Sequence, residues 1–238
     1  MSGSVYSVVG RMVVLAVFCL SLMVSQVFAH PADQPADDVM AASVSPIEST
    51  YVYSAYLKGA KTHEAEVTVS KGTFSYKIWG KAKAVGIAGF LSRFKTRFLS
   101  LGHLVNGRPV ADAFELDKTS KKSIRTVRIE GDVLKVVRNG VVRPPKKTLA
   151  HIDVLSAFFM MGECADTKEF HTGRHGYVMT LLSSTVDERG MRCDYHLIDD
   201  DMDEYDGTVW LGERDGFIVP LRFVFDGALT GTIVLKSA

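Results

Sequence analysis

Most of the chain after residue 50 alternates apolar and polar positions with a period of two. Clear examples are Thr73–Trp79 (TFSYKIW) and Ile124–Ile129 (IRTVRI), and short turns such as Asn139-Gly140 and Asp215-Gly216 separate runs of this kind. Such alternation is typical of strands with one buried face, and short turns favour antiparallel pairing. The pattern predicts a mainly β domain in which about ten strands form one curved antiparallel sheet.

Two segments depart from this alternation. Across Ile87–Leu101, apolar residues recur every three or four positions with basic residues between them, which predicts a short amphipathic helix. Val154–Met161 is apolar on nearly every side, with Asp153 placed to cap its start and Gly162 to end it. We expect this second helix to be buried on the concave face of a curved or partly closed sheet.

The basic stretch Arg93–Arg97 within the first of these segments has two interpretations. One is a lid or a membrane-facing element. The other is a helix that fills the core while its basic residues are solvated. Amphipathic stretches more often serve the core, so we favour the second interpretation. The sequence leaves open whether Arg93–Arg97 contacts a membrane.

The segment Met1–Ala29 has the features of a secretory signal peptide. A basic residue precedes the apolar stretch Met12–Leu20, and Val27 and Ala29 occupy the positions that signal peptidase reads before His30. We therefore expect cleavage after Ala29 and export to the periplasm. The alternative is a retained membrane anchor, which polar residues near the end of the apolar stretch disfavour.

The composition of the chain after Ala29 indicates its domain organisation and disfavours some classes of partner. Residues 30–49 are rich in Ala, Asp and Pro and predict a flexible leader, followed by a single domain over residues 50–238. Cleavage removes Arg11 from the 28 basic residues, which leaves 27 against 27 acidic ones. A net charge near zero argues against nucleic acid as a partner. No second apolar run is long enough to predict a transmembrane segment.

Cys164 and Cys193 are the only cysteines after the expected signal peptide. In an oxidising compartment a cysteine pair forms a disulfide by default. The alternative is a zinc site in which both thiols join His171, His175 and His196. Glycines beside the first two histidines disfavour the helical turn that would bring them together, so we favour the disulfide and expect no metal.

Other chemical motifs are weak. The acidic run Asp199–Gly207 lacks the glycine and the final glutamate of a calcium-binding loop, and it reads as a solvated turn. The chain has no G-x-S-x-G motif, no C-x-x-C motif and no glycine-rich phosphate loop. Ser156 lies near Asp153 in the sequence, but its surroundings are apolar. We therefore expect no catalytic residues, no cofactor and no enzymatic activity.

Three parts of the sequence together carry a resemblance to a known family. They are Tyr53–Lys58 with the Gly86–Phe90 bend; Asp153–Phe158; and Cys164, Gly173-Arg174, Cys193 and the closing Pro220–Phe223 strand. Over about Tyr51–Leu235 the chain resembles an exported bacterial family, domain of unknown function 3108 (DUF3108). It departs from that family at Thr172, where relatives often carry Asp, and in the acidic run, where relatives often carry a Gly/Pro-rich turn.

The resemblance implies an exported, β-rich fold and strengthens the pairing of Cys164 with Cys193. It also implies a sheet similar to the open half-barrels of periplasmic lipoprotein carriers. Those proteins bind acyl chains in an apolar concave face that a helix covers. The buried helix expected from the residues themselves is compatible with such a fold and equally compatible with a filled core.

The leading hypothesis is a non-enzymatic periplasmic domain that binds a hydrophobic, lipid-like ligand or an envelope protein in cell-envelope maintenance. Candidate lining residues, chosen for size and apolarity, are Trp79, Phe90, Phe94, Phe158, Phe159, Met160 and Trp210. One alternative is a structural or protein-interaction module with a filled core, and another is a hydrolase without a recognisable motif. The volume beneath the sheet separates the first two hypotheses.

Overall fold

The computed structural model describes residues 46–121, 123–130, 132–147, 152–160, 162–226 and 230–236. The expected signal peptide, its cleavage site and residues 30–45 of the expected leader lie outside these described residues. The first strand begins at Ile47, so the last residues assigned to the leader, up to residue 49, already belong to the sheet.

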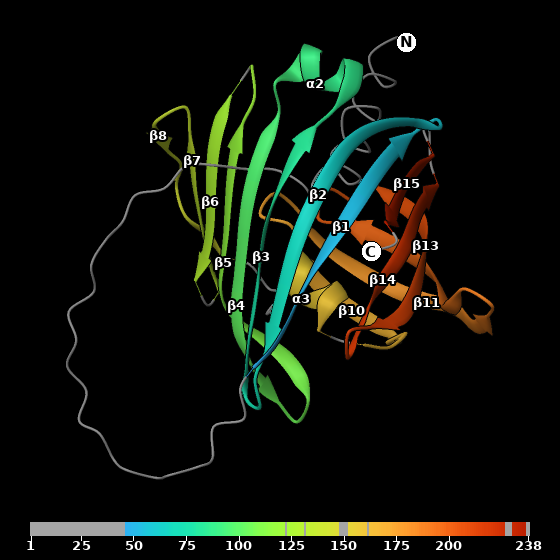
Figure 1. The fold of residues 1–238 in the computed structure, drawn as a ribbon. Helices are drawn as coiled ribbons and strands as arrows, with labels where there is room; N and C mark the ends of the chain where they lie inside the picture. Colours follow the sequence, from blue (N-terminus) through green and yellow to red (C-terminus); the bar gives the residue numbers. More distant parts are fainter. Residues whose placement is uncertain are drawn as a thin grey trace, which may run out of the picture.

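Within the described residues, fifteen strands form one antiparallel sheet and two helices accompany it (Figure 1). The strands are β1 (Ile47–Leu57), β2 (Ala60–Lys71), β3 (Ser75–Ala84), β4 (Lys95–Val105), β5 (Arg108–Thr119), β6 (Ile124–Glu130), β7 (Val133–Arg138), β8 (Val141–Val142), β9 (Lys146–Lys147), β10 (Thr167–His171), β11 (Gly176–Asp187), β12 (Gly190–Asp199), β13 (Glu204–Arg214), β14 (Phe217–Asp226) and β15 (Gly231–Leu235). The helices are α2 (Gly86–Ser92) and α3 (Val154–Phe159).

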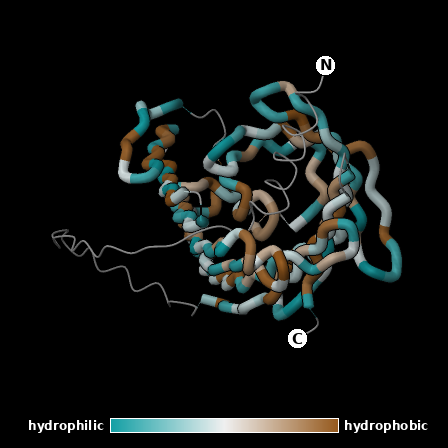
Figure 2. Tube along the Cα trace, turned by 90° about the horizontal axis from the view of Figure 1, so that it is seen from above, coloured by the Kyte–Doolittle hydropathy of each residue, from teal (hydrophilic) through white to brown (hydrophobic). Residues whose placement is uncertain are grey.

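The strand order is β10-β11-β12-β13-β14-β15-β1-β2-β3-β4-β5-β6-β7-β8, and β9 also pairs with β7. Within β1–β8 and within β10–β15, strands that follow one another in the chain are neighbours, and the pairing of β15 with β1 joins the two halves in the middle of the sheet. Seen from above, the strands curve around a central space (Figure 2). The expected mainly β fold, a large curved and open antiparallel sheet, is confirmed.

Alternating burial along the strands explains why these residues form a sheet. In β3, Tyr76 and Ile78 are buried, whereas Ser75 and Lys77 between them are exposed. A strand turns successive side chains to opposite faces, so this pattern fixes which face meets the core. The expected turn at Asn139-Gly140 has positive φ at both residues, as a tight hairpin turn requires.

The amphipathic helix expected over residues 87–101 is wrong beyond Ser92. Only its first half is helical, as α2, and the chain then continues as β4. Phe94 and Phe98 are four residues apart, a spacing that suits one face of a strand as well as one face of a helix. Thr96 between them is also buried, with 1% of its surface exposed, which shows the period of two. The expected count of about ten strands also falls short because several strands are very short.

Helix α3 fills the concave face of the sheet, as expected. All six of its residues are buried, and it contacts β3, β5, β10 and β14. It lies between the two walls of the curved sheet (Figure 1). The Asp153 side chain caps the helix by accepting hydrogen bonds from the backbone N–H groups of Leu155 (2.9 Å) and Ser156 (3.2 Å), which confirms the expected cap. The helix ends at Phe159, and Met161 lies outside the described residues.

The segment after α3 is tied to the sheet by a disulfide and by a buried lysine. Cys164 and Cys193 are bonded, with an S–S distance of 1.97 Å, so the expected disulfide is confirmed. The Lys168 ammonium donates to the carbonyl oxygens of Ala157 (3.4 Å) and Glu163 (3.2 Å). Carbonyl groups near a helix C-terminus lack intrahelical partners, and a cation there is favourable. These contacts hold α3 in the concavity.

Candidate functional site at the open end of the sheet

Helix α3 packs closely against the concave face of β1, β2, β14 and β15 in the described part of the chain. The space left between α3 and strands β1, β2, β14 and β15 is about 30 Å³, which is roughly the volume of one water molecule. The helix residues Phe158, Phe159 and Met160, expected to line a ligand cavity, are 6–8% exposed and pack in the core. The Phe158 ring contacts the rings of Phe170 and Phe223 edge-on. This region is therefore packed as a core.

The structure does not bring the seven candidate lining residues together. Trp79 and Trp210 lie on the convex face, because their strand neighbours Ile78 and Val209 face the core. Lysine and arginine side chains cover both indoles: Lys77 Nζ lies 4.8 Å from the Trp79 ring, and the Arg192 and Arg222 guanidinium carbons lie 5.6 Å and 5.3 Å from the Trp210 ring. Phe90 is exposed on α2, and Phe94 is buried beside it.

An open groove of about 610 Å³ lies where β15 is too short to follow the whole of β1. Pairing between the two strands covers only Tyr53–Leu57 of β1. The groove is lined by Thr50, Tyr51, Val52, Arg214, Asp215, Leu221, Leu235 and Lys236. The Tyr51 hydroxyl spans it and donates to the Arg214 carbonyl oxygen at 2.9 Å.

The more distinctive surface is at one end of the sheet, which we call the open end. There α2, the β5–β6 turn and the β10–β11 hairpin meet. The backbone N–H of Lys121 in the β5–β6 turn donates to the carbonyl oxygen of Ser92 at the end of α2, at 2.9 Å. The Arg125 guanidinium at the start of β6 donates from Nη2 to the carbonyl oxygen of Gly173 in the hairpin, at 2.9 Å.

Helix α2 exposes its apolar side chains at this end. Ile87 and Phe90 are each 80% exposed and Leu91 is 62% exposed, and no residue of the helix is buried. We call these three side chains the α2 surface. Three large apolar side chains on adjacent helical positions, without a covering element among the described residues, are typical of an interaction surface. Arg93 ends the helix in the left-handed conformation (φ 49°), which returns the chain to the sheet.

Exposed basic residues lie on the segments next to α2. Lys83, Arg93, Lys95 and Lys121 are exposed, and none takes part in the ion pairs formed among the described residues. Lys121 Nζ lies 5.4 Å from the centre of the Phe90 ring. Lys83 and Lys95 are direct partners on β3 and β4, and they border a convex groove of about 230 Å³. The sequence held a signal for this surface, because residues 67–111 contain eight Lys or Arg and no Asp or Glu.

Phe94 connects the α2 surface with the concave face. It is 6% exposed, its ring packs edge-on against the buried His63 ring at 5.2 Å, and Lys118 Nζ lies 5.0 Å from it. Burial, together with the nearby charge of Lys118, lowers the pKa of His63 to about 4. His63 is therefore a neutral core side chain at neutral pH.

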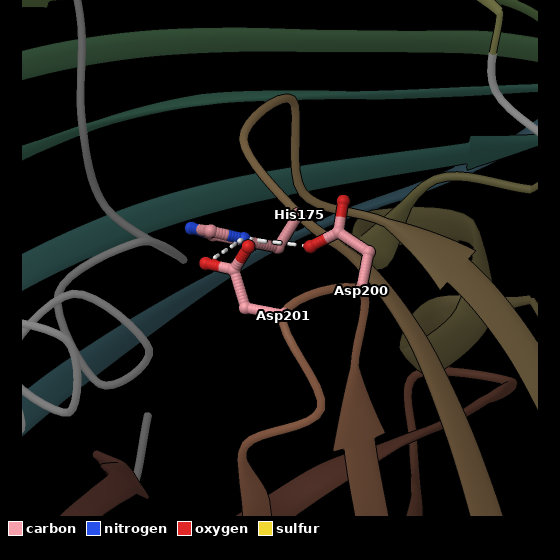
Figure 3. A group of neighbouring side chains, drawn as sticks. All are labelled: His175, Asp200 and Asp201. Atoms are coloured by element: carbon pink, nitrogen blue, oxygen red, sulfur yellow. Dashed lines mark hydrogen bonds and ion pairs between the residues drawn. The ribbon is translucent and has the colours of Figure 1, made fainter.

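A second polar group at the open end joins two hairpins. His175 Nδ1 lies 2.7 Å from Asp200 Oδ1 and 3.7 Å from Asp201 Oδ2 (Figure 3). The backbone N–H of Gly176 also donates to Asp200, at 3.3 Å. Both carboxylates approach the same ring nitrogen, so the group joins the β10–β11 hairpin to the β12–β13 turn. Asp199 shapes that turn by accepting from the backbone N–H groups of residues 201 and 203.

The ligands considered for zinc do not converge. The two cysteines are bonded to each other. His171 Nδ1 accepts a hydrogen bond from the Gly173 backbone N–H at 2.7 Å, and His196 Nδ1 lies 2.9 Å from Asp206 Oδ1 on the neighbouring strand. The grouping of His175 with Asp200 and Asp201 is the one that the sequence did not indicate, because it depends on which turns lie at the same end of the sheet.

A buried network between α3 and the sheet contains Asp, Ser and Tyr side chains, which are residue types that serve as catalytic groups in many enzymes. Asp153 Oδ2 accepts from the hydroxyls of Ser100 and Ser156, each at 2.7 Å, and the Ser156 hydroxyl is 2.8 Å from that of Tyr76. Burial raises the pKa of Asp153. Both serines are 0% exposed, so a substrate has no access to their hydroxyls. The network anchors α3 to β3 and β4.

Comparison with known proteins gives a likeness of fold only. No protein-family model and no curated protein matches the chain. A crystal structure of a β-barrel-like protein of domain of unknown function DUF1849 from Brucella abortus aligns with a TM-score of 0.40 and 8% identity, over 83% of this chain and 98% of that one. Among the described residues, neither helix has the length and apolarity needed to cross a membrane.

Proposed function

We propose that this chain is an exported, non-enzymatic β domain of the DUF3108 type that docks on an anionic membrane surface of the cell envelope. The observation that carries the proposal is the α2 surface, in which Ile87, Phe90 and Leu91 are exposed and Lys121 Nζ lies 5.4 Å from the centre of the Phe90 ring. Export and periplasmic location rest on the signal-peptide pattern of Met1–Ala29, and the family rests on the resemblance described above.

The arrangement has the physical features of an interfacial anchor. Apolar side chains on one helix enter the boundary between headgroups and acyl chains, while flanking Lys and Arg side chains meet anionic headgroups. Full burial of a side chain such as Ile, Leu or Phe is worth about 1.5–3 kcal/mol, and each cation near an anionic surface adds about 1 kcal/mol. A seven-residue helix therefore supports weak, reversible docking that is sensitive to salt.

A membrane fits the observations better than a lipid enclosed in the concave face. An acyl chain needs far more than the roughly 30 Å³ that α3 leaves there. The charge around the α2 surface also favours an anionic occupant over a neutral one. An envelope protein with an acidic and apolar face would satisfy the same chemistry, and the experiment below separates it from the membrane.

The non-enzymatic part of the proposal is supported by the burial of the polar network. Asp153, Ser100 and Ser156 are the described residues whose chemistry and contacts come nearest to a nucleophile with a base, and all three are buried. The His175 group at the surface pairs with carboxylates in a manner that connects two turns. Neither arrangement offers a substrate-accessible nucleophile.

Co-sedimentation with vesicles tests the proposal. We expect the mature chain to bind vesicles of phosphatidylglycerol and phosphatidylcholine, to release them as salt rises, and to ignore pure phosphatidylcholine. Phe90→Ser is expected to weaken binding by about tenfold. Phe74→Ser is the matched control, because Phe74 is 77% exposed in the β2–β3 turn, remote from α2. Absence of wild-type binding, or equal losses in both variants, would reject membrane docking and leave a protein as the occupant.

A further inference from the structure

Three basic residues form a directly paired row across the concave side of the open end. Lys118 on β5 is the register partner of Arg125 on β6, and Arg125 is the partner of Arg138 on β7. Thr96 on β4 extends the row as the partner of Lys118. We call Lys118, Arg125 and Arg138 the cationic row.

The row faces the interior of the curved sheet. Two residues further along the same strands, Leu116, Val127 and Val136 form another paired row that belongs to the hydrophobic core. Residues two apart on a strand point to the same face, so the cationic row is the next layer above the core. Lys118 and Arg125 are half-buried, and Arg138 is exposed at the rim.

A fourth cation is held over the row by the β10–β11 hairpin. Arg125 Nη2 donates to Gly173 O, and Gly173 packs tightly against Leu116 and Val127. The next residue, Arg174, is therefore placed close to the row, and its charge acts on both Lys118 and Arg125. Burial, followed by these neighbouring cations, lowers the pKa of Lys118 to about 8 and that of Arg125 to about 10.

A bound anion would offset the repulsion within this row. Like charges directly opposite on neighbouring strands destabilise a sheet. Among the described residues, no carboxylate forms an ion pair with Arg125, Arg138 or Arg174. Asp200, whose charge acts on the neighbouring His171, is itself paired with His175. Two buried donors, Arg125 Nε and Thr96 Oγ1, also have no hydrogen-bond partner in the described part of the chain.

We propose that the cationic row, with Arg174, binds a phosphate-type oxyanion at the open end of the sheet. Arginine presents several N–H donors in a planar fork that matches the oxygens of phosphate, and lysine adds a point charge. Phe94 separates the row from the α2 surface, with its ring 5.0 Å from Lys118 Nζ. The oxyanion has two sources, free phosphate or a phospholipid headgroup, and only the second rests on the proposed docking of α2.

Calorimetric titration in phosphate-free buffer tests the site with three probes: inorganic phosphate, glycerol 3-phosphate, and dihexanoyl phosphatidylglycerol in monomeric form. The variants are Arg125→Gln and Arg138→Gln. Their matched controls are Arg128→Gln on β6 and Lys135→Gln on β7, exposed cations on the opposite face of the same strands. We expect each row variant to weaken binding by about tenfold or more, and each control to leave it unchanged. Arg138 is exposed, so its variant keeps the test valid if Arg125→Gln does not fold.

The probes separate the two sources. Binding of phosphate and glycerol 3-phosphate supports a site for a free phosphate group, whereas binding of the lipid alone supports a headgroup site. Absence of binding by all three, or equal losses in the control variants, would overturn the proposal. Phe90→Ser should retain binding of soluble phosphate. A wild-type chain that binds phosphate but no vesicles would count against docking alone. A wild-type chain that binds vesicles but none of the three probes would count against the oxyanion site alone.

Discussion

Arg125 donates a hydrogen bond from Nη2 to the carbonyl oxygen of Gly173 at 2.9 Å, and this contact joins parts of the sheet that are far apart in strand order. Arg125 is on β6, near one edge of the sheet, and Gly173 is in the hairpin that connects the other edge strand, β10, to β11. The hairpin thereby spans the opening of the half-barrel. Glycine is suited to the position because its φ is +77° and the inner face of β5 and β6 leaves no room for a Cβ.

Replacement of Gly173 by Ala is expected to lower the free energy of unfolding. An added Cβ would lie 2.8 Å from Val127 Cγ1 and 3.2 Å from Leu116 Cδ2, in addition to the strain of positive φ. We expect a loss of about 2–4 kcal/mol from strain and overpacking together. Gly107→Ala is the matched control, because Gly107 has the same φ of +77° with nothing within 4 Å of the added Cβ. Equal losses in urea denaturation would contradict the packing role of the hairpin.

The disulfide between Cys164 and Cys193 is expected to stabilise the fold by about 3–4 kcal/mol. It closes a loop with a sequence separation of 29 residues and so restricts the unfolded chain. Denaturant midpoints of the oxidised protein and of the Cys164→Ser/Cys193→Ser double variant measure the difference. Non-reducing peptide mapping that found both thiols free in protein purified without reductant would contradict the bond itself.

Acidification is expected to destabilise the domain between about pH 6.5 and pH 4. Burial is the main cause that lowers the pKa of both His63 and His171 to about 4, below the ordinary value of 6.5. The unfolded chain therefore binds more protons in this window, and stability present above it is lost as the pH falls. Protonation would also remove the lone pair with which His171 Nδ1 accepts from Gly173 N–H.

Melting temperatures across this window provide the measurement. His171→Asn should flatten part of the pH dependence, because asparagine does not titrate. His103→Asn is a suitable control, since His103 is an exposed side chain on β4 that pairs with Asp112. A wild-type melting temperature that is constant from pH 7 to pH 4 would be inconsistent with buried neutral histidines.

Asp153 makes the free energy of unfolding depend on pH in the opposite direction from the two buried histidines. Burial raises its pKa, so the folded state retains the proton more firmly than the unfolded chain does. Its contribution to stability is greatest below the unfolded value of 3.8 and declines as the pH rises through the folded pKa. Asp153→Asn should preserve the cap and remove this decline, whereas Asp153→Ala should cost about 2–4 kcal/mol through loss of the cap and of buried hydrogen bonds. Equal stability of the two variants would contradict the role of the network.

Sequence patterns predicted the features that depend on local order. Alternation predicted the strands, Asp153 indicated the start of α3, and the expectation of export indicated the disulfide. A helix was predicted where β4 forms because Thr96 is polar by residue type although it is buried. The period of two was therefore not visible in the pattern of apolar residues. The filled concavity depends on how closely α3 approaches the strands, which no local pattern specifies.

The two surfaces at the open end were missed for a different reason. Lys118, Arg125 and Arg138 belong to separate alternating runs, and only strand register makes them neighbours. His175 meets Asp200 because two hairpins lie at the same end of the sheet. The apolar side chains of α2 were visible in the sequence, but the assumption that an amphipathic helix serves the core assigned them to the interior.

The central claim is that α2 enters an anionic membrane surface, and a tryptophan placed at Phe90 tests it most directly. The emission of Phe90→Trp, after subtraction of the wild-type signal, is expected to shift to shorter wavelength with phosphatidylglycerol vesicles and to stay constant with phosphatidylcholine vesicles. Phe74→Trp, at a comparably exposed position away from α2, should not respond to either. Emission from Phe90→Trp that is unchanged by both kinds of vesicle would contradict the account.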